Sequence, residues 1–293
     1  MEKKQNFTIK FLLLISLLMA GVLLVAGISA LLIKYSGISP EDIDIQSLVL
    51  HNPELAKWIL FCQHLVLFII VPLVFLWIFY KRGMVEELNT GSFKFKDVIH
   101  FFVLLMLVYP LMGVLTFWLS LLDLPEWMNL MDKSQEETLM TLLKMENGYD
   151  FMFNLFLLAF VPGIGEELLF RGVLQREVFK KTQKIHLSIM ISSLFFAALH
   201  FQALGFTSKL CISLVLGYAY YFSGNILVPM ILHMVNNGSA TFAVFYSKGD
   251  IFDTQHQDIH FSWSQVVVVV LFLMLCILYY FYLEQHFKHK SNG

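Results

Sequence analysis

Charge is scarce in this sequence, since Asp, Glu, Lys and Arg make up 14% of its 293 residues. A soluble globular domain has about 25% charged residues. Hydrophobic residues make up 58%, and the mean hydropathy is +0.70. The shortage of charge excludes an ordinary soluble domain and predicts a helical membrane protein. The net charge is −2, and no basic patch with interleaved aromatic residues is found, so we expect no nucleic-acid partner.

Cysteines and internal repeats are also scarce. The three cysteines, Cys62, Cys211 and Cys276, all lie in apolar runs, where they are typical of small buried hydrophobic residues. They exclude a disulfide framework and a cysteine metal site. The lack of an internal repeat counts against a transporter built from two related halves.

Apolar runs long enough to cross a bilayer predict an all-α protein of about eight transmembrane helices. The first run is longer than the apolar core of a signal peptide, about 7–15 residues, so we expect it to remain as a span. The predicted spans are Phe11–Ile33, Ile59–Tyr80, Val98–Leu122, Phe151–Phe179, Leu187–Leu204, Leu210–Phe222, Ile226–Tyr246 and Val266–Tyr282.

The charges between the spans predict the orientation of the chain. Basic residues flank the N-terminus, the loops after spans two and four, and the C-terminus, whereas the loops after spans one, three and seven are acidic. Basic loops stay in the cytoplasm, so this alternation predicts that both termini are cytoplasmic.

We divide the chain into three parts. Residues 1–149 hold spans one to three and a surface helix, residues 150–247 form a core of spans four to seven, and residues 248–293 hold the last span and tail. The surface helix is predicted because Ser134 and Glu137 have capping-box spacing ahead of an apolar helical face.

Two adjacent carboxylates and an arginine interrupt the fourth predicted span. A charge at the centre of a membrane helix costs about 2.5–3.5 kcal/mol, so each needs a partner. Glu167 and Arg171 are four residues apart and can pair on one helix face. Glu166 has no partner within its own helix, and an unpaired intramembrane carboxylate indicates a functional site.

Later spans add further polar groups. The fifth has His200 four residues after Phe196, and the seventh has His233, Asn236 and Asn237 on one helix side. One histidine alone is more often a packed core residue, as we interpret His64 and His100. The other histidines, His51, His186, His256, His260, His286 and His289, are interpreted as loop or interface residues.

Together, a carboxylate, two imidazoles and an amide supply what peptide hydrolysis needs. They provide a base for water and donors for the oxyanion. Asn236 is equally compatible with a packing role. The motifs E-E-x-x-x-R, F-x-x-x-H and H-x-x-x-N, in this order over about Asp150–Ser247, resemble the CAAX protease and bacteriocin-processing (CPBP, or Abi) family of intramembrane proteases. That family includes CAAX prenyl endopeptidases of the Ras-converting type.

The resemblance implies a bacterial plasma-membrane endopeptidase that cleaves a membrane-associated protein or peptide. Glu166 and His200 would activate the attacking water, and His233 and Asn237 would complete the site. Glu167 and Arg171 would brace it. A non-proteolytic scaffold or immunity protein on the same fold, and an ion-coupled transporter with Glu166 as relay, are the alternatives.

A metal is a separate question. Glu166, His200 and His233 match the ligand types of a catalytic zinc site, but the same residues also suit a metal-free mechanism, and the sequence leaves both open.

The two histidines are predicted at different depths in the membrane, which is a difficulty for either mechanism. His200 lies about 20 Å into its span and His233 about 10 Å into its own, at 1.5 Å per residue. They meet only if span seven starts deep or the turn at 223–225 is re-entrant.

Overall fold

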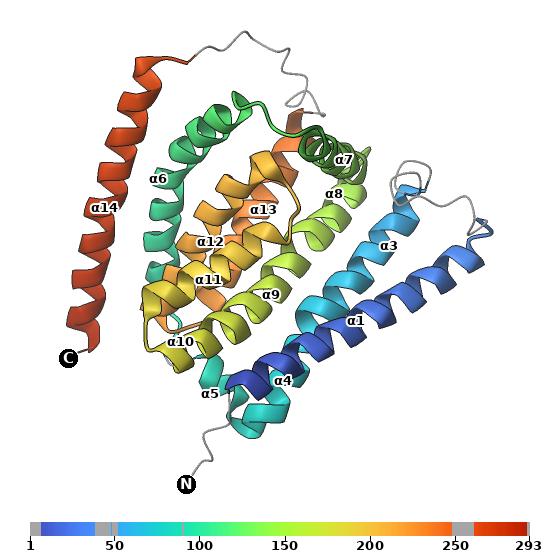
Figure 1. Ribbon diagram of the computed structural model, residues 1–293, viewed down its shortest axis with the longest axis horizontal. Helices are drawn as coiled ribbons and strands as arrows, with labels where there is room; N and C mark the ends of the chain where they lie inside the picture. Colours follow the sequence, from blue (N-terminus) through green and yellow to red (C-terminus); the bar gives the residue numbers. More distant parts are fainter. Residues whose placement is uncertain (1–6, 39–47, 49–51, 90, 248–260, 292–293) are drawn as a thin grey trace.

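The computed structural model describes residues 7–38, 48, 52–89, 91–247 and 261–291. The long elements in these ranges are helices, which confirms the predicted all-α class (Figure 1). In chain order they are α1 (Phe7–Tyr35), α3 (Pro53–His64), η2 (Leu65–Ile70), α4 (Val71–Tyr80), η3 (Lys81–Gly83), α5 (Met84–Leu88), α6 (Phe95–Ser120), α7 (Glu126–Leu142), α8 (Gly148–Leu155), η4 (Phe156–Phe160), α9 (Val161–Glu167), η5 (Leu168–Gln175), α10 (Arg176–Thr182), α11 (Ile185–Ala198), α12 (Ala203–Ser223), α13 (Leu227–Ser247) and α14 (Trp263–Ser291). Of the short segments, η2, η4 and η5 are π-helical and η3 is a 3-10 turn.

Among the described residues, six helices are long and apolar enough to cross a membrane. They are Phe7–Tyr35, Pro53–Leu88, Phe95–Ser120, Gly148–Thr182, Ala203–Ser223 and Trp263–Phe287. The predicted count of eight is therefore not confirmed. The other two predicted spans coincide with α11 and α13. The 14 residues of α11 reach about 21 Å, short of a hydrocarbon core of about 30 Å, and α13 has the polar residues His233, Asn236 and Asn237.

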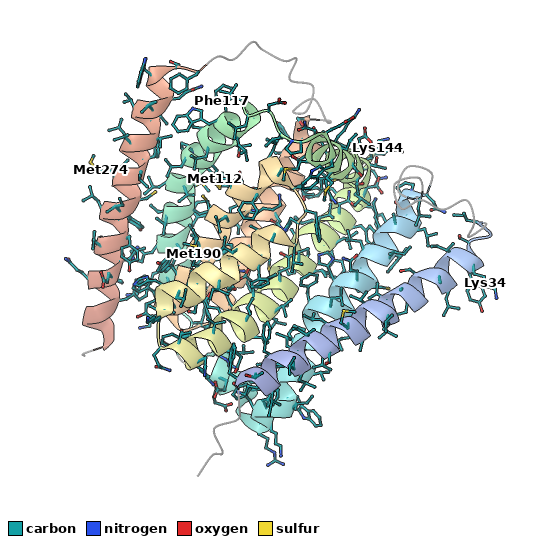
Figure 2. All side chains as sticks on the ribbon, viewed as in Figure 1. Lys34, Met112, Phe117, Lys144, Met190 and Met274 are labelled. Carbon is teal, nitrogen blue, oxygen red and sulfur yellow. The ribbon has the colours of Figure 1, made fainter. Side chains whose placement is uncertain are left out.

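The helices form one bundle with α12 packed between α6 and α11. The α8–α10 rod crosses the middle of the view in Figure 1, α1, α3 and α4 lie beyond one side of it, and α14 stands outside α6 on the other side. Figure 2 shows Met274 pointing outward from α14, where it is exposed, whereas Met112 of α6 is buried. Exposed apolar side chains along α14 fit a helix that faces lipid.

Close contacts with glycine bring α9 against its neighbours. A Cβ atom on Gly165 would lie 2.9 Å from the Cβ atom of Phe68 in η2, and one on Gly163 would lie 2.6 Å from Cγ of Met234 in α13. Small residues allow such approaches between membrane helices. Because Glu166 adjoins Gly165, it comes within reach of both η2 and α13.

The turn between α12 and α13 is buried. Ser223 and Asn225 are 6% and 5% exposed. Gly224 is left-handed at φ +64°, and its carbonyl accepts a hydrogen bond of 2.9 Å from the amide of Gly91. This pairing buries the start of α13 against the segment that follows α5.

The predicted capping box is wrong. The helix of this region, α7, begins at Glu126 after Pro125, so Ser134 lies within the helix and does not cap it. Asn147 is the residue that caps a helix nearby, since its side chain accepts hydrogen bonds from the amides of Tyr149 and Asp150 at the start of α8.

Candidate active site

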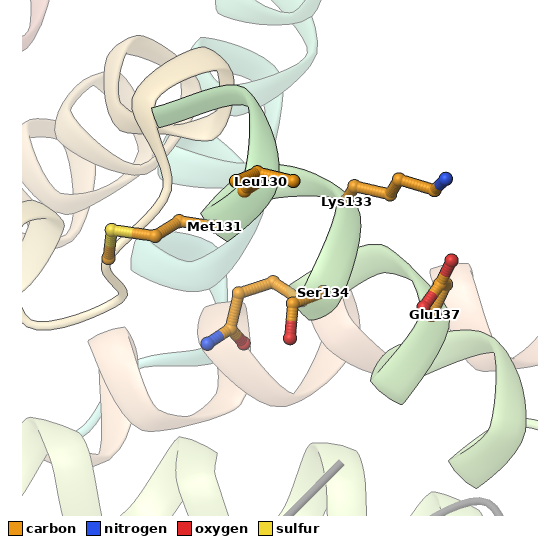
Figure 3. A pocket seen from close by; sticks show the side chains of 6 residues that line it. Leu130, Met131, Lys133, Ser134 and Glu137 are labelled. Atoms are coloured by element: carbon orange, nitrogen blue, oxygen red, sulfur yellow. The ribbon is translucent and has the colours of Figure 1, made fainter. Parts of the chain in front are cut away.

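The site is not the pocket in Figure 3. That pocket is lined by α7 alone, by residues Leu130, Met131, Lys133, Ser134, Gln135 and Glu137. None of the predicted site residues is among them. The predicted groups gather around the C-terminal end of α9, inside the bundle.

The helix that carries the glutamates changes its winding next to them. The π-helical segment η5 begins directly after Glu167, and η4 ends two residues before Pro162. Single π-helical turns occur often at functional sites. Pro162 has no N–H, and in a regular α-helix that group would bond the carbonyl of Leu158. The Nδ2 atom of Asn237 donates to this carbonyl at 3.2 Å.

Glu167 is fully buried and accepts two hydrogen bonds. Its Oε1 atom accepts from Nη1 of Arg171 at 2.9 Å and from Nδ1 of His233 at 2.8 Å. Nη2 of Arg171 donates to the carbonyl and the hydroxyl of Ser213, at 2.9 and 2.8 Å. The predicted contact between Glu167 and Arg171 is thus present. The contact with His233 was not predicted, and through it Glu167 also orients an imidazole.

Glu166 faces two other helices. Its Oε1 atom lies 3.5 Å from Nε2 of His64, and its Oε2 atom lies 3.8 Å from Nε2 of His233. The residue is 7% exposed, and Oε2 has no hydrogen-bond partner within the described ranges. Both distances exceed those of a direct hydrogen bond. The carboxylate therefore keeps its capacity to accept a proton from a water molecule.

Three imidazoles are oriented in the same way. Nδ1 of His64 lies 3.0 Å from the carbonyl of Leu60, and Nδ1 of His200 lies 2.8 Å from that of Phe196. A carbonyl only accepts, so in both rings Nδ1 carries the hydrogen. His233 has Glu167 in the same place. In a neutral ring so held, Nε2 is an acceptor, and the Nε2 atoms of His64 and His233 face Glu166.

The two predicted histidines meet despite their different positions along the helices. The rings of His200 and His233 pack on Phe196, with centroids 4.9 and 5.8 Å from its own. His200 lies just past the end of α11 and not within a helix as predicted. The buried 223–225 turn brings His233 to the same ring.

Asn237 is held by a chain of hydrogen bonds. Tyr109 of α6 donates to Oδ1 of Asn236 at 2.6 Å, and Nδ2 of Asn236 donates to Oδ1 of Asn237 at 3.0 Å. This fixes the amide of Asn237 with Nδ2 toward the carbonyl of Leu158. One N–H of that amide is used there, and no second bond from Nδ2 is found among the described residues. Asn236, for which two roles were open, orients Asn237.

Three residues that touch this network were not predicted from the sequence: His64, Tyr109 and Ser213. His64 was interpreted as a core histidine. An ionisable residue inside a predicted span was the available signal, but its partner is more than 100 residues away in the sequence. Contacts of that kind follow from helix packing and not from local spacing.

The predicted zinc ligands do not form a metal site in the structure. Within the described residues, no group of three or more His, Cys, Asp or Glu side chains is arranged to hold a metal ion. The donor types of Glu166, His200 and His233 suit zinc. Nδ1 of His200 and of His233 is bonded to Phe196 and to Glu167, so Nε2 is the nitrogen of each ring that is left to bind a metal.

A family comparison covers this part of the chain. Residues 148–239 match the family model described as type II CAAX prenyl endopeptidase Rce1-like. The chain contains an Rce1-like domain. The match runs from α8 into α13 and contains every predicted site residue, whereas His64 and Tyr109 lie outside the Rce1-like domain.

One relative among curated proteins is the uncharacterized protein YpbD of Bacillus subtilis (strain 168). It is 39% identical over 82 residues, which is 27% of this chain and 39% of the relative. The chain thus spans well under half the length of that relative. No solved structure matches the chain.

Proposed function

We propose that this chain is an intramembrane endopeptidase that cleaves a membrane-associated protein or peptide. The observation that carries the proposal is the buried carboxylate of Glu166, which faces the Nε2 atoms of two imidazoles from different helices. The Rce1-like domain and the six long apolar helices of the described residues, two of which lie within that domain, support the same function.

The proposed chemistry uses the side chains of the site alone. Glu166 takes one proton from water while Nε2 of His200 accepts a hydrogen bond from the O–H that remains, and the resulting hydroxide attacks the carbonyl carbon of the peptide bond. The oxyanion accepts hydrogen bonds from the second N–H of Asn237 and from His233 when that ring holds a proton on both nitrogens. Glu166 then passes its proton to the leaving amine, which restores the carboxylate.

Glu167 and Arg171 act through His233 in this scheme. Glu167 holds Nδ1 of His233, and Arg171 with Ser213 holds Glu167. In this scheme the supporting role predicted for Glu167 and Arg171 is to orient the imidazole of His233.

Cells that produce the wild-type protein or the Glu166→Ala variant test the proposal. Mass spectrometry of new N-termini in the membrane fraction should find fragments that depend on wild-type protein. The control is Glu136→Gln, which alters an exposed carboxylate on α7 and should give the wild-type fragments. Identical fragments from Glu166→Ala and wild type would contradict the proposal and favour the scaffold or immunity alternative.

A further inference from the structure

His64 lies beside the candidate site but outside the Rce1-like domain. It is the last residue of α3, immediately before the π-helical segment η2. Its side chain is 13% exposed, and its ring packs on that of Phe68 with centroids 5.3 Å apart. The contact of Gly165 with Phe68 brings this part of the chain against α9.

The ring of His64 has only one nitrogen free for the site. Nδ1 is bonded to the carbonyl of Leu60 and therefore carries a hydrogen. Nε2 points to Oε1 of Glu166 at 3.5 Å. Two lone pairs would repel each other at this distance, so the approach is favourable when one proton lies between Nε2 and Oε1.

Arg171, the cationic residue nearest to Glu166 in the sequence, does not pair with it. Arg171 is committed to Glu167 and Ser213 by three hydrogen bonds. Among the described residues, the ion-pair partners within 4.0 Å of the Glu166 carboxylate are two imidazoles, His64 from α3 and His233 from α13. Because His233 is also bound to Glu167, His64 is the one of the two that faces Glu166 without binding a second carboxylate within the described residues.

We propose that His64 is a positioning residue, whose ring, protonated on both nitrogens, forms an ion pair with Oε1 of Glu166 and leaves Oε2 to act on water. The proposal rests on the proposed endopeptidase function. It assigns the N-terminal helices a direct part in the site, since α3 supplies a side chain that the Rce1-like domain does not contain.

Two substitutions of His64 separate positioning from packing. His64→Leu keeps an apolar side chain and removes Nε2, so kcat should fall roughly 10–100-fold, the loss typical of removing a group that orients a site residue, with little change in KM. His64→Gln retains an N–H that can donate to Oε1 and should recover a large part of the rate. The substrate is a peptide that spans a cleavage site found in the membrane-fraction experiment.

The matched control is His100→Leu. His100 is a histidine of α6 whose ring bonds the hydroxyl of Tyr279 in α14. His100→Leu should cleave at the wild-type rate. A folded His64→Leu protein with the wild-type rate, or equal losses in His64→Leu and His64→Gln, would overturn the proposal.

A melting experiment tests the contact without any substrate. Single and double variants of His64→Leu and Glu166→Gln are melted in detergent, and the effects on Tm should depart from additivity by about 2–4 °C, since residues in contact are coupled. Additive effects would overturn the proposal. A lack of Glu166-dependent cleavage in wild type would instead contradict the endopeptidase function, and the melting data would still show whether His64 holds Glu166.

Discussion

Glu166 and Glu167 are neighbours in the sequence but are held by different partners. Glu167 accepts hydrogen bonds from a guanidinium and an imidazole, and its side chain is 0% exposed. Glu166 faces two imidazoles at longer distances. The first arrangement suits a structural anion, and the second suits a base.

The Glu167→Gln substitution should destabilise the protein. It leaves Arg171 as a buried cation without a charged partner, which typically costs about 3–5 kcal/mol. It also weakens the hold on Nδ1 of His233, so activity should fall in the protein that remains folded. Thermal unfolding in detergent measures the first effect, with Glu136→Gln on the exposed face of α7 as control. Equal melting temperatures for the two variants would contradict the buried ion pair.

At the scale of helices, the site depends on how closely α9 approaches its neighbours. The glutamates occupy the end of α9, His64 precedes η2, and His233 lies in α13. Glycines on α9 permit both contacts. A small displacement of α9 would therefore change the distances from Glu166 to both rings.

The Gly165→Ala substitution should displace α9 from η2. Its new Cβ atom would lie 2.9 Å from the Cβ atom of Phe68, and overpacking of this kind costs about 1–3 kcal/mol. We expect a lower Tm and a lower cleavage rate. Gly113→Ala in α6 is the control because its Cβ atom would meet nothing within 4 Å, so its Tm should stay the same or rise. Equal behaviour of the two variants would count against this packing.

The sequence predicts helix positions better than helix geometry. Apolar runs located the first span within Phe7–Tyr35 and the fourth within Gly148–Thr182, because apolar length is a local property. The sequence did not predict the π-helical segments. It also did not predict that α11 ends at Ala198 or that α7 begins at Glu126. These features depend on packing against other helices or on a proline that starts a helix without a capping side chain.

The same difference between local and long-range contacts applies to the site residues. The spacing of Glu167 and Arg171 predicted their contact because four residues make one helix turn. The pairing of Glu167 with His233, and of Glu166 with His64, joins residues 66 and more than 100 positions apart. The spacing of residues within one helix cannot predict contacts with a different helix. The oligomeric state and the substrate are likewise not features of a local pattern.

At the scale of the molecule, helices outside the Rce1-like domain contribute to its network. The α3 helix supplies His64 and α6 supplies Tyr109, which donates to Asn236. In Figure 1 the start of α1 and the end of α14 lie toward the same end of the bundle as α5 and α10, and α7 lies toward the opposite end. The division into residues 1–149, 150–247 and 248–293 stays a prediction.

Reporter fusions test the orientation of the whole chain. Fusions at Lys181 and at the C-terminus should report the cytoplasm, and fusions at Ser134 and Asp253 should report the outside. The loop charges motivate this expectation. Asp253 lies outside the described residues. An external signal at Lys181 would contradict the predicted orientation of the candidate site.

The most direct test of the central claim is the Glu166→Gln variant, studied by melting and by cleavage in nanodiscs. The substitution keeps the shape of the side chain, removes the base and relieves a buried charge. We expect a Tm at or above that of wild type and a cleavage rate lower by about 10²–10⁴-fold, the contribution of a general base. A folded Glu166→Gln protein that cleaves the peptide at the wild-type rate would contradict the catalytic role of Glu166.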